Sequence, residues 1–171
     1  MAKNKQADAL KADVQSVESV EADVCCVVRL KNTAERALHY ISDVRATRYD
    51  AAARTLTLSL SDDGREVIPG AMAKLPEFKY IDPDSEAEIT LRVPEKVVRL
   101  SRSGPPGKLA FETHWLNEAD EVIVEVGWAD VPYYADTRAK GKDTQLPAAR
   151  WQQHKTVARK RVERSKQSKG D

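Results

Sequence analysis

The sequence of 171 residues contains only two cysteines, Cys25 and Cys26, and they are neighbours. Adjacent residues of an extended strand point to opposite faces, and a ring closed between two adjacent cysteines is strained. Because the chain has no third thiol, the sequence excludes a framework of internal disulfides. We expect one of the two cysteines to lie in the core as a small apolar residue. A soft-metal site is disfavoured, because it would need further soft ligands.

Long apolar segments are also missing. The longest uncharged apolar run covers residues 24–28, whereas a membrane-spanning helix needs about 20 apolar residues. Residues 1–6 are polar and basic and have no apolar segment behind them, so we expect no secretory signal. These observations predict a protein that does not bind membranes and that resides in the cytoplasm.

Motifs that carry common chemistry are absent from the sequence: it has no G-x-S-x-G, no G-x-x-x-x-G-K and no G-x-G-x-x-G. Two of the three histidines, His39 and His114, lie in segments with strand periodicity. Together with Asp43 or Glu112 they could form an acid–base pair or part of a metal site. No other ligand spacing accompanies them, which favours two ordinary, half-exposed strand residues. We therefore predict a non-catalytic protein without cofactor or metal, and rank a small enzyme or metal-binding domain third among the functional hypotheses.

Carboxylates gather at residues 62–63 and 82–88. Calcium takes six or more oxygen ligands, which the loops at one end of a two-sheet domain can supply. Aspartate is also common in turns, because its side chain bonds to nearby backbone amides. The sequence favours turns over a cation site.

Segments with strand periodicity are short and regularly spaced. In residues 54–61, Leu56, Leu58 and Leu60 alternate with Thr and Ser, which predicts a strand with one buried face. The spacing of turn residues and the lack of a convincing central helix are typical of an antiparallel sandwich or barrel and exclude a parallel α/β layout. We predict an all-β domain of seven or eight strands over residues 14–137. The other strand candidates are residues 14–20, 24–31, 38–49, 87–93, 97–100, 109–115 and 122–128.

Three segments resemble parts of immunoglobulin-like domains. Residues 30–38, LKNTAERAL, are similar to a strand–turn–strand of these domains, and residues 81–91, IDPDSEAEITL, are similar to the proline turn before their middle strand. Residues 111–128 resemble their last hairpin. The resemblance implies an immunoglobulin-like antiparallel β-sandwich, and a shared sandwich alone does not imply a function.

The formal net charge of +1 hides a strong asymmetry along the chain. Residues 138–171 contain 11 basic and 3 acidic side chains, whereas residues 1–137 contain 17 basic and 24 acidic ones. Charge and periodicity together predict a polar N-terminal arm over residues 1–13, an acidic β-domain over residues 14–137 and a basic tail over residues 138–171.

The basic tail has the pattern of a short amphipathic helix. Pro147 suits a first helical turn, and Trp151, Lys155, Ala158 and Val162 follow at helical spacing, which would form one narrow stripe. The rest of this helix would be covered by Arg159, Lys160, Arg161 and Arg164. We predict a partly helical tail that becomes ordered when it binds a partner.

Three interpretations of the tail are open. It could dock into a groove or an acidic surface of a protein partner, with Trp151 entering first. It could neutralise the phosphates of a nucleic acid while Trp151 stacks on a base. It could also be a solvated, solubilising segment.

Aromatic residues follow the last predicted strand. Trp128, Tyr133 and Tyr134 could fill or cap the sandwich, or could form a contact surface, since these residue types are enriched at binding sites. The main functional hypothesis is a non-catalytic binding or accessory subunit of a cytoplasmic protein assembly, in which the sandwich and the tail each contact a partner. A nucleic-acid-associated protein is the second hypothesis. The predicted partner-binding residues are Trp128, Tyr133, Tyr134, Trp151, Lys155, Arg159, Lys160, Arg161 and Arg164.

Overall fold

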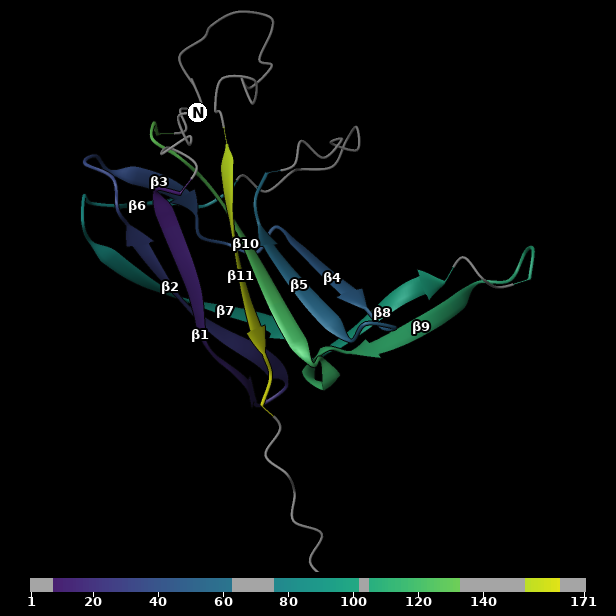
Figure 1. The fold of residues 1–171 in the computed structure, drawn as a ribbon. Coiled ribbons are helices and arrows are strands. Elements are labelled where there is room, and N and C mark those ends of the chain that lie inside the picture. Colours follow the sequence, from purple (N-terminus) through teal and green to yellow (C-terminus); the bar gives the residue numbers. More distant parts are fainter. Residues whose placement is uncertain (1–7, 63–75, 102–104, 133–152, 164–171) are drawn as a thin grey trace, which may run out of the picture.

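Two β-sheets form the body of the protein in the computed structural model, which describes residues 8–62, 76–101, 105–132 and 153–163 (Figure 1). Sheet A consists of β1 (Leu10–Val20), β2 (Asp23–Asn32) and β7 (Glu86–Pro94), all antiparallel and in this order. The strands of sheet B are β3 (Leu38–Ile41), β4 (Ala46–Asp50), β5 (Thr55–Leu60), β6 (Phe78–Ile81), β10 (Glu121–Ala129) and β11 (His154–Arg161). Their order is β4-β5-β10-β3-β6, and β11 pairs with β10 outside this path.

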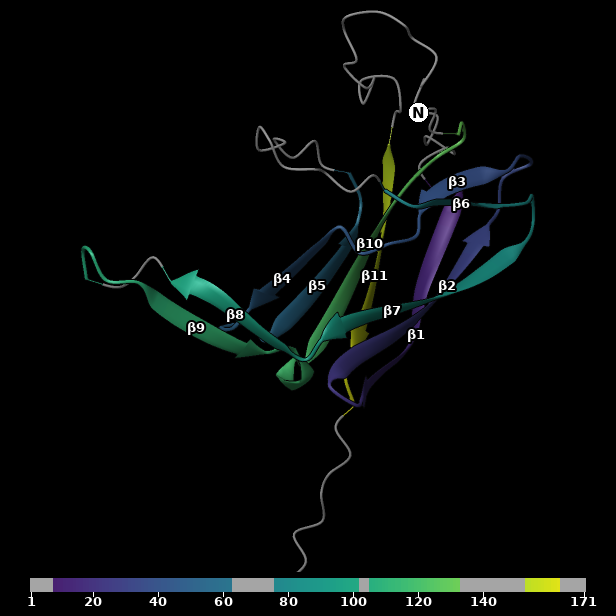
Figure 2. The same cartoon turned by 180° about the vertical axis from the view of Figure 1, so that it is seen from behind.

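A third, two-stranded sheet extends away from the body, as both views show (Figures 1 and 2). It is the antiparallel hairpin of β8 (Lys96–Ser101) and β9 (Ala110–Trp115), which we call the ribbon. The short 3₁₀ helix η1 (Leu116–Glu118) connects the ribbon to β10.

The predicted all-β fold class is confirmed for the described residues, where η1 is the one element that is not a strand. Each predicted strand segment contains a strand, and the segment 38–49 is divided between β3 and β4. Strands β6 and β11 were not predicted. The expectation of purely antiparallel pairing is wrong, because β10 runs parallel to β5. The expectation that residues 111–128 form a last hairpin is also wrong, because β9 pairs with β8 while β10 belongs to sheet B.

Side chains from both sheets meet in one apolar core. The alternation seen in the sequence of β5 buries Leu56, Leu58 and Leu60 completely. Strand β10 contributes Val122, Val124, Val126 and Trp128, all fully buried, and β2 contributes Val24, Cys26, Val28 and Leu30. Burial of each large side chain contributes about 1.5–3 kcal/mol, so β10 is the central strand of the core.

Both backbone edges of β10 are paired. Its residues Glu121–Val126 run parallel to β5 on one edge, and Glu121–Trp128 run antiparallel to β11 on the other. Trp128 is in register with both Tyr40 of β3 and His154 of β11, which places β3 and β11 on opposite edges. Strand β3 therefore continues the edge where β5 ends.

The prediction of a helix in the basic tail is wrong for residues 154–161, which form β11. In the strand, Thr156 and Ala158 face inward, whereas Lys155 and Arg159 face solvent. Lys155 and Ala158, expected on one helical stripe, thus lie on opposite faces. The segment forms a strand despite its helical spacing because it pairs with eight residues along one edge of β10. Its β-branched residues Thr156 and Val157 also favour a strand.

Hydrogen bonds of the Thr156 and Gln153 side chains hold β11 against the body. The indole Nε1 of Trp128 donates a hydrogen bond to Thr156 Oγ1 at 3.0 Å, and Thr156 Oγ1 donates to the Leu10 carbonyl at 2.9 Å. Gln153 Oε1 accepts a hydrogen bond from the Asp62 amide at 2.8 Å. A Cβ at Gly127 would meet the end of the Gln153 side chain and lie 3.1 Å from the Ser61 Cα, so a larger residue there would displace Gln153 from Asp62.

Sheet residues extend beyond the limits 14–137 expected for the β-domain. Residues 10–13 of the predicted arm belong to β1, and β11 comes from the predicted tail. Strands β1 and β11 lie side by side, joined through the Thr156–Leu10 hydrogen bond (Figure 1). The first and last described strands of the chain therefore meet at one edge of the body.

The turn predicted from residues 30–38 is organised by Asn32, which is fully buried. Its Oδ1 accepts a hydrogen bond from the Ala34 amide at 2.8 Å, and its Nδ2 donates to the carbonyls of Arg36 and Ile81 at 2.8 and 3.0 Å. One side chain thus connects the turn after β2 to the end of β6.

We predict that Thr156→Val destabilises the protein by about 1–3 kcal/mol, because the valine methyl leaves the buried Trp128 indole N–H without its acceptor. Urea denaturation followed by circular dichroism measures this change. The matched control is Thr90→Val on the exposed face of β7, which should stay within about 0.5 kcal/mol of the wild type. Equal stability of the two variants would contradict the structural role of Thr156.

Candidate functional site

The ribbon carries four large apolar side chains on one face. Residues directly opposite each other in an antiparallel pair share a face, and the register pairs Lys96 with Trp115, Val98 with Thr113 and Leu100 with Phe111. These positions are two residues apart along each strand, so all six side chains lie on the same side. We call Val98, Leu100, Phe111 and Trp115 the ribbon stripe.

The ribbon stripe is open to solvent. Its members expose 54% (Val98), 57% (Leu100), 67% (Phe111) and 42% (Trp115) of their surface. The Lys96 ammonium lies 5.6 Å from the centroid of the Trp115 ring, which shields part of the indole. Beyond Phe111, Leu109 is 76% exposed and extends the apolar surface.

The opposite face of the ribbon is anchored to the body. Val97 packs against the core, and the Arg99 guanidinium donates a hydrogen bond to the Thr47 carbonyl of β4. The His114 ring lies 5.6 Å from the Tyr49 ring, centroid to centroid, again on β4. These contacts fix the orientation of the hairpin, so the ribbon stripe faces away from β4.

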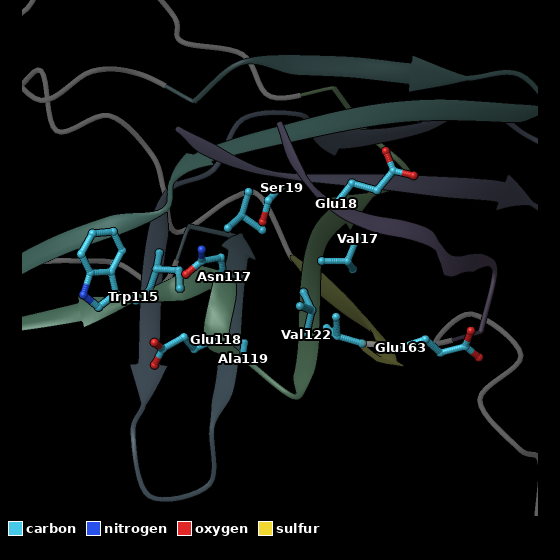
Figure 3. A pocket seen from close by; sticks show the side chains of 12 residues that line it. Val17, Glu18, Ser19, Trp115, Asn117, Glu118, Ala119, Val122 and Glu163 are labelled. Carbon is cyan, nitrogen blue, oxygen red and sulfur yellow. The ribbon is translucent and has the colours of Figure 1, made fainter. Parts of the chain in front are cut away.

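A pocket of about 800 Å³ lies at the base of the ribbon (Figure 3). Glu95 positions its walls: its amide donates to the Ala22 carbonyl at 2.9 Å, and its carbonyl accepts from the Leu116 amide at 2.6 Å. The β1–β2 hairpin and η1 are thereby held beside each other. Trp115 belongs both to the ribbon stripe and to the lining of this pocket, so the two surfaces are continuous.

The pocket has an apolar floor and an acidic rim. Buried side chains form the floor, among them Leu116, Ala119 and Val122. Glu18 and Glu163 are exposed at the rim and come from the end of β1 and from the residues after β11. Glu118 of η1 is the third glutamate of the lining.

The structure describes five of the nine predicted partner-binding residues. Trp128 is completely buried and stacks 4.7 Å from the His154 ring, centroid to centroid, so it fills the core and is not part of the surface. The outward-facing cations of β11 are Lys155, Arg159 and Arg161, while Lys160 is half-buried. The remaining four predicted residues, Tyr133, Tyr134, Trp151 and Arg164, lie outside the described residues.

The outward cations of β11 share their face with carboxylates of β10. Arg159 lies 3.8 Å from Glu121, and Arg48 of β4 contacts both carboxylate oxygens of Glu125 at 3.1 Å. Both ion pairs are partly exposed, so each contributes little to stability. Their effect is to lower the net positive charge on this face of sheet B.

The structure does not bring the two candidate histidines together. His39 lies in β3, beside Tyr80, and His114 lies in the ribbon, 3.5 Å from Glu112. Strands β3 and β9 are at opposite ends of the molecule in both views (Figures 1 and 2). Within the described ranges, no group of three or more His, Cys, Asp or Glu side chains could hold a metal ion. The carboxylates at residues 82–88 include the turn before β7, where the Ser85 amide donates to the Asp82 carbonyl at 3.2 Å.

Sequence reasoning missed the exposed apolar face of the ribbon. The alternation in residues 109–115 indicated a strand, but alternation alone does not show whether the apolar face is covered by a second sheet. The adjacent pair Val97 and Val98 was a usable signal, since it places apolar side chains on both faces of a short strand.

Comparisons with protein-family models, with curated proteins and with solved structures found no match to this chain. None of the helices in the part of the chain that the structure describes has the length and apolar character to cross a bilayer.

Burial makes Cys26 a weak nucleophile. Its side chain is fully buried in the core, and desolvation, with a smaller contribution from neighbouring Cys25, raises the pKa of its thiol from 9.0 to about 12. The thiolate is the reactive form, so Cys26 is protected at neutral pH. This agrees with the expectation of one core cysteine.

We predict that iodoacetamide does not modify Cys26 in the native protein at pH 8, but does so in 8 M urea, as measured by peptide mass spectrometry. Because the unfolded thiol ionises near pH 9 and the folded one does not, raising the pH above 9 also lowers the free energy of unfolding. Iodoacetamide modification of the Cys25→Ser variant serves as the control, because it removes any contribution from the neighbouring thiol. Equal modification rates in buffer and in urea would contradict the buried position.

Proposed function

We propose that the chain is a non-catalytic accessory subunit of a cytoplasmic protein assembly, and that the ribbon is its main contact surface. The observation that supports this proposal is the ribbon stripe: four large apolar side chains on one face of a hairpin whose other face is held by β4. Contiguous apolar surface of this kind marks interaction sites in soluble proteins.

The physical cost of leaving the stripe exposed supports the same function. A two-stranded hairpin is at best marginally stable in water, and here it also exposes Leu100 and Phe111. Burial of each of these side chains in an interface would contribute roughly 1.5–3 kcal/mol. Phe and Trp are enriched in the centres of interfaces, where Phe111 and Trp115 would be placed.

The domain proposed for this subunit is a variant of the immunoglobulin-like sandwich. The neighbours β1-β2-β7 and β3-β10-β11 correspond to the A-B-E and C-F-G strands of such domains. In this interpretation, β4 and β5 are inserted between β3 and β6, and the ribbon is inserted between β7 and β10. A ribbon that the sandwich does not require for its core is available for binding.

The basic strand supports a second contact with an acidic surface of a protein partner. Lys155, Arg159 and Arg161 alternate along the exposed face of β11 at separations of four and two residues. Because β11 pairs with β10, the backbone positions of these side chains are fixed, with the exposed Val157 between Lys155 and Arg159, in contrast to the flexible tail expected from the sequence. Charge complementarity of this kind would mainly increase the rate and the specificity of association.

We predict that a photo-crosslinking amino acid at Phe111 captures a defined protein in the native cell. The matched control carries the same amino acid at Thr90, which is exposed on β7 of the body. A second comparison places the crosslinker at Leu109. There the double variant Leu100→Glu and Phe111→Glu should give at least about 90% less crosslinked product than the protein without these two substitutions, because each buried apolar side chain is replaced by a desolvated charge. Its urea midpoint should match that of the wild type, since both side chains are exposed.

An identical set of products from positions 111 and 90 would contradict the proposal. So would full capture by the double variant, because the stripe would then contribute nothing to binding.

A second candidate function is nucleic-acid binding, favoured by the row of Lys155, Arg159 and Arg161 on β11. If these three cations bind phosphates, the affinity for a 20-nucleotide single strand should fall about 20-fold between 50 and 200 mM salt. Fluorescence anisotropy measures this affinity, and the double variant Lys155→Glu and Arg161→Glu should abolish binding. A salt-independent affinity, or unchanged binding by this variant, would exclude the row as a phosphate site.

A further inference from the structure

The pocket at the base of the ribbon combines features that select one class of ligand. Its volume of about 800 Å³ lies in the range of small-molecule sites, and it is open at the end of the body between η1 and β1. The floor is formed by Val24, Leu116 and Val122, which are buried and apolar. The buried apolar side chains of the floor therefore favour an apolar chain over a compact polar group.

The ionisable groups of the lining have one sign. They are Glu18, Glu118 and Glu163, and among the described residues no lysine, arginine or histidine lines the pocket. Figure 3 shows Trp115 and Glu118 on one side of Val122 and Glu163 on the other. In this view the Glu118 and Glu163 carboxylates point away from Val122, so a cation in the mouth would be attracted by exposed carboxylates on two sides. It would also lie near the Trp115 indole, whose ring Lys96 already approaches.

We propose that this pocket binds an aliphatic cation, namely the side chain of a lysine or arginine of the protein that contacts the ribbon. The methylene stem lies over Val122 and Leu116, and the charged end lies between Glu18 and Glu163. Lysine and arginine are the side chains that combine an apolar stem with a charged end. The assignment to a protein rests on the proposed function; the binding of an aliphatic cation does not.

The position of Trp115 supports a protein as the source of this cation. Its indole connects the two surfaces, since it belongs to the ribbon stripe and also lines the pocket. A segment that covers Val98 and Leu100 and continues past Trp115 reaches the mouth of the pocket. A basic residue at that point of the segment would be bound by Glu18 and Glu163.

The first test uses hexylammonium as the probe, with hexanol and hexanoate as controls of equal chain length. Binding is followed by the NMR shifts of the Val17 and Val122 methyl groups and by Trp115 fluorescence. We expect hexylammonium to bind about tenfold more tightly than hexanol, hexanoate not to bind, and the preference to disappear at 0.5 M salt. Equal binding of hexylammonium and hexanol, or no binding of either, would overturn the proposal.

Matched variants separate the rim from the general charge of the protein. Glu18→Gln with Glu163→Gln should lower the hexylammonium affinity about tenfold and leave that of hexanol unchanged. Glu35→Gln with Glu88→Gln removes the same charge at exposed positions elsewhere and should have no effect on either probe. All four side chains are exposed, so the variants should fold, which urea denaturation verifies. Equal loss in both double variants would contradict a site at this rim.

A last arm identifies the source of the cation. In the cell, Glu18→Gln with Glu163→Gln should weaken crosslinking from position 111. Full crosslinking, with hexylammonium affinity lost, would overturn the assignment to the partner.

Removal of residues 164–171, which are basic and follow Glu163 directly, should leave hexylammonium affinity unchanged. A rise would show that this chain's own segment is the occupant. Crosslinking that fails at position 111 in the wild type, with hexylammonium still bound, would contradict the proposed function but not the pocket.

Discussion

Strand β10 imposes the strictest requirement on the fold, because its side chains Val122, Val124, Val126 and Trp128 are fully buried and both of its backbone edges must be paired. A buried amide or carbonyl without a partner costs about 1–3 kcal/mol. Strand β5, and after it β3, pairs with one edge, and β11 pairs with the other. Strand β11, which comes from the basic segment, is therefore part of the folded body. Lys155, Arg159 and Arg161 face solvent because the alternate residues of β11 must face Trp128 and Val124.

This arrangement determines where the proposed contact surfaces lie. Strand β11 ends beside the start of β10, which brings Glu163 to the mouth of the pocket below the ribbon. The ribbon leaves the body at Glu95 and returns at η1, so its base forms one wall of that pocket. The apolar stripe and the acidic rim meet at Trp115. A partner segment with apolar residues followed by a basic one would fit both the ribbon stripe and the pocket. The charge of the tail alone had suggested only a partner with an acidic surface.

The sequence predicted most strands but little of their pairing, for physical reasons that particular residues show. Leu56, Leu58 and Leu60 alternate strictly, and their burial followed from that pattern. Strand β11 could not be found in the same way, because Trp151, Lys155, Ala158 and Val162 also fit a helix, and the choice depends on the open edge of β10, which is distant in sequence. The same limit applies to the candidate site: Phe111 and Val124 occupy similar alternating patterns, yet one is 67% exposed and the other is fully buried, since only one of the two strands is covered by a second sheet.

We expect the basic segment His154–Arg161 to be a strand of the folded protein without any partner. Amide hydrogen exchange of the full chain alone, resolved by peptide mass spectrometry, measures whether it is. We expect the amides of His154–Arg161 that bond to β10 to exchange as slowly as those of Glu121–Ala129, because both depend on opening of the same core. Complete exchange of His154–Arg161 within seconds, while Glu121–Ala129 stays protected, would show instead that the segment is an unattached tail.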